Sequence, residues 1–258
     1  MTSMTFFQAT AKDKAEFDRE GFIIVPGLFT PAEARQLGQT ARNDAKTWSD
    51  ATERADASGA RTLLAVRDDL SEDIYSAIVR SRRIVESMST LLGDEVYHYH
   101  HKLMLKEPKV GGAWEWHQDY GYWYNYGCLF PSMASCYIAI DRAVKANGCL
   151  QVLPGSHLLG RMDHGKVGGQ TGADPERMLA ILERFPLRYV ELEPGDGLFF
   201  HGNLLHRSDQ NTSDDPRWSL ICCYNTRGNS PYEVKRHNAY QPLKVLDDAE
   251  IFAPGRNV

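Results

Sequence analysis

The sequence predicts an all-β core with helical additions, on three observations. Many short apolar or alternating segments are separated by turn signals such as Pro154-Gly155-Ser156 and Glu193-Pro194-Gly195-Asp196. Segments with helical spacing lie mainly at the N-terminal end, before residue 95. The chain has 258 residues, 42% hydrophobic and 24% charged, which suits one large globular domain. Together these features indicate an antiparallel barrel or jelly roll, buttressed by N-terminal helices.

The helical buttress is expected over about residues 1–95. Lys12–Glu20 has helical spacing and leads into a short apolar run, Gly21–Gly27, that predicts a buried strand ended by a turn. A capping sequence, Thr30-Pro31-Ala32-Glu33, then predicts a helix running to about Trp48.

The next segments alternate between loop, strand and helix. Ser49–Ala60 is small, polar and charged, and is expected to be a surface loop of limited order. Leu63–Val66 is expected to be a strand, and the apolar recurrence in Ser71–Leu92 predicts one or two helices packed on the sheet.

The barrel is expected over about residues 96–230. Its first strand begins at Val96, and its polar face, which carries His98, His100, Lys102 and Lys106, is expected to look into a cavity. Further strands are expected at about residues 134–141, 150–153, 188–192, 197–201 and 219–227.

An insertion at about residues 158–185 interrupts the barrel strands. It contains a glycine-rich piece, Gly165–Gly172, and a helix expected from about Pro175 to Arg184, and we interpret it as a lid. The chain shows neither an internal repeat nor a linker rich in Pro, Gly or Ser, so a single domain over residues 1–258 is expected.

Composition narrows the class of protein. No apolar run is long enough to span a bilayer, and Met1–Asp13 lacks the pattern of a secretory signal, so a cytoplasmic protein is expected. The five scattered cysteines are expected to be reduced and buried. A net charge of -5 argues against nucleic acid as a partner.

The most informative motif is His117-Gln118-Asp119. Residues two apart on an extended segment point the same way, so His117 and Asp119 are predicted to reach one metal ion. A third ligand must come from farther along the chain, where His206 is the candidate and His201 competes with it. Two histidines and one carboxylate on one face of an octahedron suit non-haem Fe(II), whereas zinc more often takes a closed tetrahedral set.

Arg217 follows His206 by eleven residues, on a segment expected to be a strand. An Fe(II) oxygenase with a dicarboxylate co-substrate needs a fixed cation near its metal, and a guanidinium holds a carboxylate with two parallel hydrogen bonds. Arg217 is therefore the predicted partner of such a co-substrate.

The chain resembles the phytanoyl-CoA dioxygenase family of Fe(II)- and 2-oxoglutarate-dependent oxygenases. The matching pieces run in order from about residue 15 to about residue 227: Gly21–Gly27, Lys106-Glu107-Pro108, His117-Gln118-Asp119, Asn147-Gly148-Cys149-Leu150, Pro154-Gly155-Ser156-His157, Pro194-Gly195-Asp196, Phe200-His201, His206-Arg207-Ser208, Gln210-Asn211 and Arg217. The resemblance implies a double-stranded β-helix, that is, a cupin-like jelly roll.

The resemblance also assigns roles to residues at matching positions. It implies that His117, Asp119 and His206 bind iron, and that Arg217 and Ser208 hold the far carboxylate of 2-oxoglutarate. Lys102 and Tyr137 fall where the family places other co-substrate contacts. The implied cofactors are Fe(II), 2-oxoglutarate and O2, with ascorbate as a reductant.

The implied reaction hydroxylates an unactivated C–H bond of a small metabolite and releases succinate and CO2. Asp119 favours hydroxylation over halogenation, because halogenating relatives replace this carboxylate by a small residue. Desaturation, epimerisation and cyclisation with the same cofactors are alternative reactions. A barrel that binds a metal or ligand without turnover is a further alternative, from another class of protein.

A dense aromatic run follows the motif. At least one of Tyr120, Tyr122, Trp123 and Tyr124 is expected to face the substrate. Since aromatic faces bind cations, we expect a cationic or zwitterionic substrate. His157 follows a turn and is expected to be structural.

Overall fold

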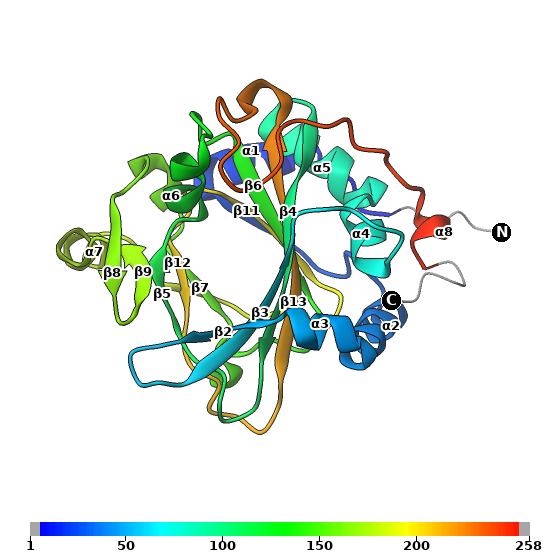
Figure 1. Ribbon diagram of the computed structural model, residues 1–258. Helices are drawn as coiled ribbons and strands as arrows, with labels where there is room; N and C mark the ends of the chain where they lie inside the picture. The colour runs from blue at the N-terminus through cyan, green and yellow to red at the C-terminus, as the bar shows by residue number, and fades with distance from the viewer. Residues whose placement is uncertain (1–5, 253–258) are drawn as a thin grey trace.

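Two facing antiparallel sheets form the core of the protein (Figure 1). The structure is a computed structural model, and it describes residues 6–252. The larger sheet has seven strands in the order β1 (Phe22–Val25), β11 (Gly197–His201), β6 (Met133–Ala139), β13 (Arg217–Thr226), β4 (Val96–Lys106), β3 (Arg61–Arg67) and β2 (Thr52–Ala55). The smaller has four: β10 (Arg188–Val190), β7 (Leu150–Val152), β12 (His206–Ser208) and β5 (Trp114–His117). Residues 1–5 and 253–258 of the predicted domain lie outside the described chain.

Helices cover the face of the larger sheet that points away from the smaller one (Figure 1). These are α1 (Ala11–Glu20), α2 (Pro31–Asn43), α3 (Ala45–Asp50), α4 (Ile74–Val79), α5 (Arg82–Leu92) and, near the C-terminus, α8 (Asp248–Ile251). One apolar core joins their buried side chains to that face, including Phe17, Leu37, Met88, Ile138 and Leu220. The predicted N-terminal buttress therefore forms, with two helices in the 71–92 segment.

A second core lies between the two sheets. Tyr137, Phe200 and Ile221 from the larger sheet meet Leu150 and Val152 from the smaller one. Strand residues alternate between the two faces, so the same strands supply both cores. Five cysteines are free and buried, as predicted. Across residues 6–252 no helix is long and apolar enough to cross a membrane.

The helix predicted to end at about Trp48 ends five residues earlier. Asp44 interrupts it in an extended conformation (φ −80°, ψ 93°), and its carboxylate accepts hydrogen bonds from the backbone of Lys46 and Thr47 at the start of α3. Asp44 is buried and forms an ion pair with Arg67 at 3.0 Å. The tertiary ion pair and the cap together outweigh helix continuation.

The segment Ser49–Ala60 is not the loop of limited order that we predicted. Residues 52–55 form the edge strand β2, which pairs with β3 through a turn ordered by the Asp56 carboxylate. All four residues of β2 are exposed, so the strand shows no apolar alternation in the sequence.

The insertion at 158–185 contains more regular structure than expected. Its glycine-rich piece forms a hairpin of β8 (His164–Val167) and β9 (Gln170–Ala173), which is followed by α7 (Pro175–Leu182). Four short 3-10 helices complete the described fold: η1 (Tyr124–Tyr126), η2 (Lys145–Asn147), η3 (Ser156–Leu159) and η4 (Arg227–Asn229).

Candidate active site

The two histidines of the predicted metal site are paired across neighbouring strands. His206 in β12 lies opposite His117 in β5, and their ring centroids are 4.1 Å apart. Neither short strand was among the predicted ones, yet this pairing brings together residues that are far apart in the sequence. Both imidazoles are buried.

Backbone carbonyls orient the two imidazoles. The Nδ1 atom of His117 donates to the carbonyl of Glu115 at 2.7 Å, and Nδ1 of His206 donates to the carbonyl of Leu204 at 2.9 Å. These bonds place the ring proton on Nδ1 and leave each Nε2 free to bind a metal.

Asp119 reaches the site from a helix rather than from the extended segment we expected. It is the first residue of α6 (Asp119–Trp123), and only Gln118 separates it from the end of β5 at His117. The backbone N–H of Tyr120 donates to the carbonyl of Gly202 at 2.9 Å and holds the first turn of α6 in place. One ligand atom from each of His117, Asp119 and His206 lies within 4.8 Å of the others, so the three predicted ligands meet at one point.

The charges around this point suit metal binding. Burial lowers the pKa of His206, and burial together with the neighbouring His206 lowers that of His117 well below its ordinary value. Burial would raise the pKa of Asp119, but the ammonium of Lys102, 3.5 Å from Oδ1, helps to hold it below its ordinary value. Neutral imidazoles and an ionised carboxylate are the forms that bind a divalent metal.

His201, the competing candidate, lies outside this cluster. Its ring packs against Phe17 and His157, and its Nδ1 accepts a hydrogen bond from the backbone of Asn203. His157 donates through Nε2 to the carbonyl of Asp18 at 3.1 Å, consistent with the structural role expected for it.

A narrow inner pocket extends from the three ligands toward Arg217. Its wall includes Lys102, Met104, His206, Ser208 and Ile221. Arg217 lies on the same face of β13 as Ile221, is fully buried and contacts Met104. Its Nη1 donates to the Tyr137 hydroxyl at 3.1 Å, whereas within residues 6–252 nothing accepts a hydrogen bond from Nε or Nη2.

The Nε and Nη2 donors of Arg217 suit the carboxylate of a bound co-substrate. A buried guanidinium without an acceptor is costly, and a carboxylate accepts two parallel hydrogen bonds from it. Tyr137, Ile221 and Lys102 lie side by side on three neighbouring strands, so Lys102 and Tyr137 both belong to this region. Tyr137 touches Arg217, and Lys102 touches Asp119.

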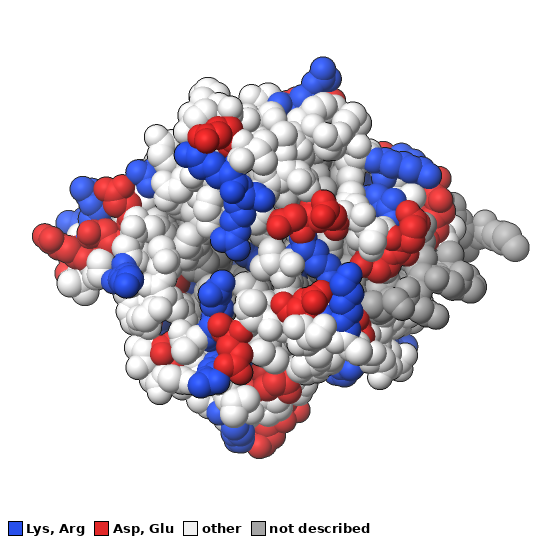
Figure 2. Space-filling view, in the orientation of Figure 1, with Lys and Arg blue, Asp and Glu red and all other residues white. Residues whose placement is uncertain are grey.

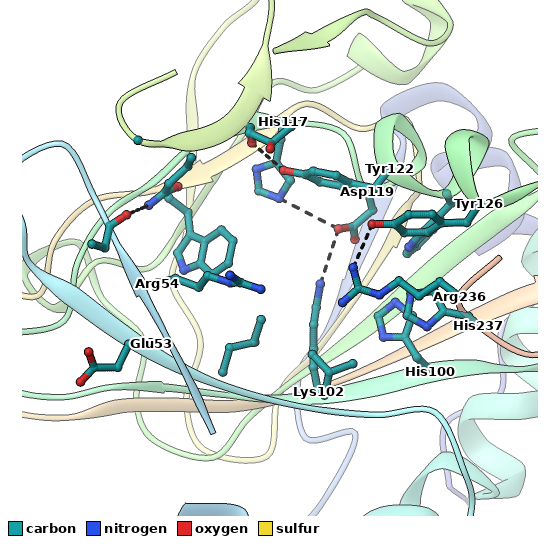
Figure 3. A pocket seen from close by; sticks show the side chains of 18 of the residues that line it. Glu53, Arg54, His100, Lys102, His117, Asp119, Tyr122, Tyr126, Arg236 and His237 are labelled. Carbon is teal, nitrogen blue, oxygen red and sulfur yellow. Dashed lines mark hydrogen bonds and ion pairs between the residues drawn. The ribbon is translucent and has the colours of Figure 1, made fainter. Parts of the chain in front are cut away.

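A larger outer cavity of about 480 Å³ is lined by two of the three ligands, His117 and Asp119, and shares Lys102 with the inner pocket. Figure 3 shows its wall, which includes Trp114, Tyr122, Trp123 and Tyr126. Of the four aromatic residues proposed to face the substrate, Tyr122 and Trp123 line this cavity. Tyr120 is buried, and its hydroxyl donates to the carbonyl of Cys128. Tyr124 is exposed, and the guanidinium of Arg161 lies over its ring.

The β8–β9 hairpin closes one side of this cavity. Gln170 donates to the carbonyl of Ala113 at 2.8 Å, and its side-chain oxygen accepts from the backbone of Glu115 at 3.2 Å. The Tyr122 hydroxyl donates to the carbonyl of Thr171 at 2.6 Å. These contacts attach the insertion to the strand and helix that carry His117 and Asp119.

Sequence reasoning missed three side chains of the outer cavity: Arg54, Arg236 and His237. Arg54 lies in the segment interpreted as a loop of limited order, and the other two lie beyond the matched residues. It also missed Gln118, whose amide binds the carbonyls of Gly160 and Asn203. No spacing in the sequence links Arg54, Arg236 or His237 to His117, and the motif alone does not reveal the contacts of Gln118.

A jelly roll that brings two histidines and a carboxylate to one buried point, with a pocket that extends toward a buried arginine with free donors, is typical of metal-dependent oxygenases. A family model, "Phytanoyl-CoA dioxygenase (PhyH)", matches residues 17–219. The chain belongs to this family.

Relatives with known functions agree with that class. The chain is 27% identical to L-proline trans-4-hydroxylase of Streptomyces griseoviridis, over 93% of this chain and 94% of the relative. The structure of EctD from S. alaskensis with bound Fe has a TM-score of 0.78 and 22% identity, covering 96% of this chain and 90% of that one. The epimerase SnoN from nogalamycin biosynthesis, in complex with Fe3+, alpha ketoglutarate and nogalamycin RO, has a TM-score of 0.72 at 19% identity, covering 91% of this chain and 94% of that one.

The predicted family, fold and enzyme class are confirmed by these matches. The protein is a dioxygenase, and its core is the predicted jelly roll with N-terminal helices. Iron and 2-oxoglutarate, the predicted cofactors, occur in structures of the relatives, since EctD has also been solved with 2-oxoglutarate and 5-hydroxyectoine.

Proposed function

We propose that this protein is an Fe(II)- and 2-oxoglutarate-dependent dioxygenase that hydroxylates an unactivated C–H bond of a small metabolite. The reaction consumes the substrate R–H, O2 and 2-oxoglutarate, and yields R–OH, succinate and CO2. The observation that carries the proposal is the convergence of His117, Asp119 and His206 within 4.8 Å, together with the buried Nε and Nη2 atoms of Arg217, which have no acceptor within residues 6–252.

The donor set fits the cofactors. His117, Asp119 and His206 would hold iron, which activates O2 when it is bound. Arg217 would bind the far carboxylate of 2-oxoglutarate, with Ser208 at the same end of the inner pocket. Tyr137 would orient the guanidinium that it touches, and Lys102 would balance the charge of Asp119 at the junction of the two cavities.

Asp119 supports hydroxylation over halogenation, because the carboxylate occupies the metal position that a halide would need. Desaturation, epimerisation and cyclisation are the alternative outcomes with the same cofactors. Epimerisation has one specific observation in its favour, the structural likeness to SnoN. Product analysis separates these outcomes: hydroxylation adds one oxygen atom, desaturation and cyclisation each remove two hydrogen atoms, and epimerisation leaves the mass unchanged. NMR then distinguishes the double bond of desaturation from the new ring of cyclisation.

The substrate is a small molecule, consistent with the size of the outer cavity and with the proline hydroxylase among the relatives. Between the two charge classes predicted, zwitterionic and cationic, we favour the zwitterion, because two arginines as well as several aromatic rings line the cavity. The buried, unpaired thiols support a cytoplasmic location.

The first experiment measures succinate released from 2-oxoglutarate by the purified protein with Fe(II), ascorbate and O2. A panel of small metabolites is then screened for those that stimulate this release. Succinate formation that depends on iron is the expected result. If the protein binds metal and yet forms no succinate with any metabolite, the alternative interpretation, a non-catalytic metal-binding barrel, replaces the dioxygenase.

A further inference from the structure

We propose that Arg54 and Arg236 form a carboxylate-binding subsite at the outer end of the cavity. The substrate class that follows is an amino-acid-like carboxylate, which enters with its carboxylate outward. This inference rests on the proposed function, since it concerns the substrate cavity of the same site.

The two arginines approach the cavity from opposite sides. Arg54 projects from the edge strand β2, and Arg236 comes from the C-terminal segment that follows η4. Figure 3 shows both guanidinium groups directed into the space above Lys102. A carboxylate placed between two planar guanidinium groups can accept hydrogen bonds from both.

The charges on the cavity wall do not cancel. The basic residues on it are Arg54, Lys102, Lys166 and Arg236, with His237, and the acidic ones are Glu53 and Asp119. Glu53 pairs with Arg61 and Asp119 pairs with Lys102. His237 is hydrogen-bonded to Asp68.

Three cations therefore remain. Across residues 6–252, neither Arg54, Lys166 nor Arg236 forms an ion pair with a carboxylate. Basic side chains also gather in a band near the middle of the face shown in Figure 2. A wall with an excess of positive charge attracts an anionic group and disfavours a purely cationic ligand.

Arg236 is held in place before any ligand binds. Its Nη1 donates to the Tyr126 hydroxyl at 3.0 Å, and the guanidinium lies 5.4 Å from the centre of the Tyr126 ring. The next residue, His237, is buried, hydrogen-bonded to Asp68 and stacked on His100 with ring centroids 4.4 Å apart. Such fixed donors reduce the entropy lost on binding.

The subsite also determines which end of the substrate reaches the metal. Arg54 and Arg236 are exposed, whereas His117 and Asp119 are buried at the inner end of the same cavity. Aromatic faces, including Tyr122, line the wall and suit an ammonium group or an apolar ring. A carboxylate at the outer end therefore directs the far carbon atoms of the substrate to the metal, so the oxidised carbon lies away from the carboxylate.

Binding by matched ligands tests this inference. Calorimetry is performed without O2 on protein loaded with Fe(II) and 2-oxoglutarate, using the free amino acids (L-proline among them), their amides, and tetramethylammonium. At least one amino acid is expected to bind, and its amide to bind about tenfold or more weakly, because the amide lacks the charged acceptor. Arg54→Gln and Arg236→Gln are each expected to weaken binding of the amino acid to a similar degree. Arg142→Gln is the matched control, since Arg142 is an exposed arginine outside the cavity that pairs with Glu193.

Three outcomes overturn the inference: no amino acid binds, the amide or tetramethylammonium binds as tightly as the acid, or both arginine variants bind normally. A hydroxyl group found next to the carboxylate by NMR overturns the proposed orientation. A different result would refute the proposed function alone. If an amino acid binds through both arginines but no succinate is formed with O2, the subsite stands and the dioxygenase assignment falls.

Discussion

The Nζ atom of Lys106 donates to the hydroxyl oxygen of Ser208 at 3.0 Å, at the Arg217 end of the inner pocket. Lys106 and Arg217 are directly opposite on β4 and β13, and both are fully buried. In the described part of the chain, neither has a carboxylate partner. Burial and the charge of Arg217 hold the pKa of Lys106 well below its ordinary value. A bound dicarboxylate would supply the missing negative charge.

Lys106→Met is expected to raise the KM for 2-oxoglutarate by about tenfold, because Ser208 then loses a charged donor and the pocket loses one cation. Methionine keeps most of the side-chain volume. Steady-state kinetics with varied 2-oxoglutarate measure the effect. Lys109→Met, at an exposed lysine that pairs with Asp214, is the control and should leave KM unchanged. An unaltered KM in Lys106→Met would show that Lys106 only supports the fold.

Arg217→Met is expected to weaken 2-oxoglutarate binding much more. Losing a buried charged contact costs about 2–5 kcal/mol, which corresponds to a rise in KM of roughly thirtyfold or more. Metal content, measured separately, should be unaffected, because Arg217 does not touch the three ligands. Tyr137→Phe removes only the hydroxyl that accepts from Nη1, and should give a smaller rise. Equal KM values for Arg217→Met and the parent protein would exclude the assigned role.

His206→Ala is expected to abolish iron binding and all turnover, since two ligands hold a divalent ion poorly. His201→Ala is the matched control: it removes a half-buried imidazole at the end of β11, five residues before His206 and outside the metal cluster. This control should retain stoichiometric iron at low temperature, even with reduced stability. Metal analysis after chelator treatment and reloading decides the question, and loss of iron in His201→Ala but not in His206→Ala would reverse the assignment.

The pH dependence of stability should reflect His201. Burial, followed by the charge of His157, lowers the pKa of His201 from 6.5 to about 4. Between these values the unfolded chain binds a proton that the folded protein excludes, so stability is fully present above pH 6.5 and is lost as pH falls toward 4. The loss should be about 3 kcal/mol.

Urea unfolding at several pH values measures this loss. His201→Gln, which keeps an acceptor for the backbone of Asn203, should show a smaller decline in stability across the same range. An identical decline in both proteins would mean that other groups cause it.

The metal cluster could be predicted from the sequence because its chemistry is local to two short motifs. His117 and Asp119 lie two residues apart, and His206 is distinguished by its polar neighbour Ser208. The geometry behind it was only partly right, since Asp119 begins a helix instead of extending the strand. The three side chains still converge, because either conformation can bring two side chains that are two residues apart to one point.

The outer cavity could not be predicted in the same way. Arg54 lies on an edge strand that is exposed on both faces, so its sequence has the composition of a loop. Arg236 lies in a segment without regular structure, and its position depends on contacts with Tyr126 and with the neighbouring His237. Such tertiary contacts leave no periodic signal, which is why the substrate end of the site emerged only with the fold.

The last prediction concerns Tyr122, which connects the insertion to the active site. Its ring lies between those of His117 and His164, at centroid distances of 5.9 Å and 5.5 Å, and its hydroxyl binds the carbonyl of Thr171 in β9. Tyr122→Phe keeps the ring and removes only this hydrogen bond, so that the hairpin is held by fewer contacts. If the insertion acts as the predicted lid, substrate-stimulated turnover should fall several-fold, with about 1 kcal/mol or less lost in stability.

Two controls separate this effect from general damage. Tyr124→Phe alters an exposed ring outside the cavity and should change neither rate nor stability. Tyr120→Ala removes a buried ring and should lower the melting temperature, with substrate-stimulated and uncoupled 2-oxoglutarate turnover declining together, because a cavity of this kind costs about 3–5 kcal/mol. Only Tyr122→Phe should reduce the ratio of stimulated to uncoupled turnover at an almost unchanged melting temperature. If that ratio stays at the parent value, the hairpin is a fixed wall of the cavity and the lid interpretation of the insertion is wrong.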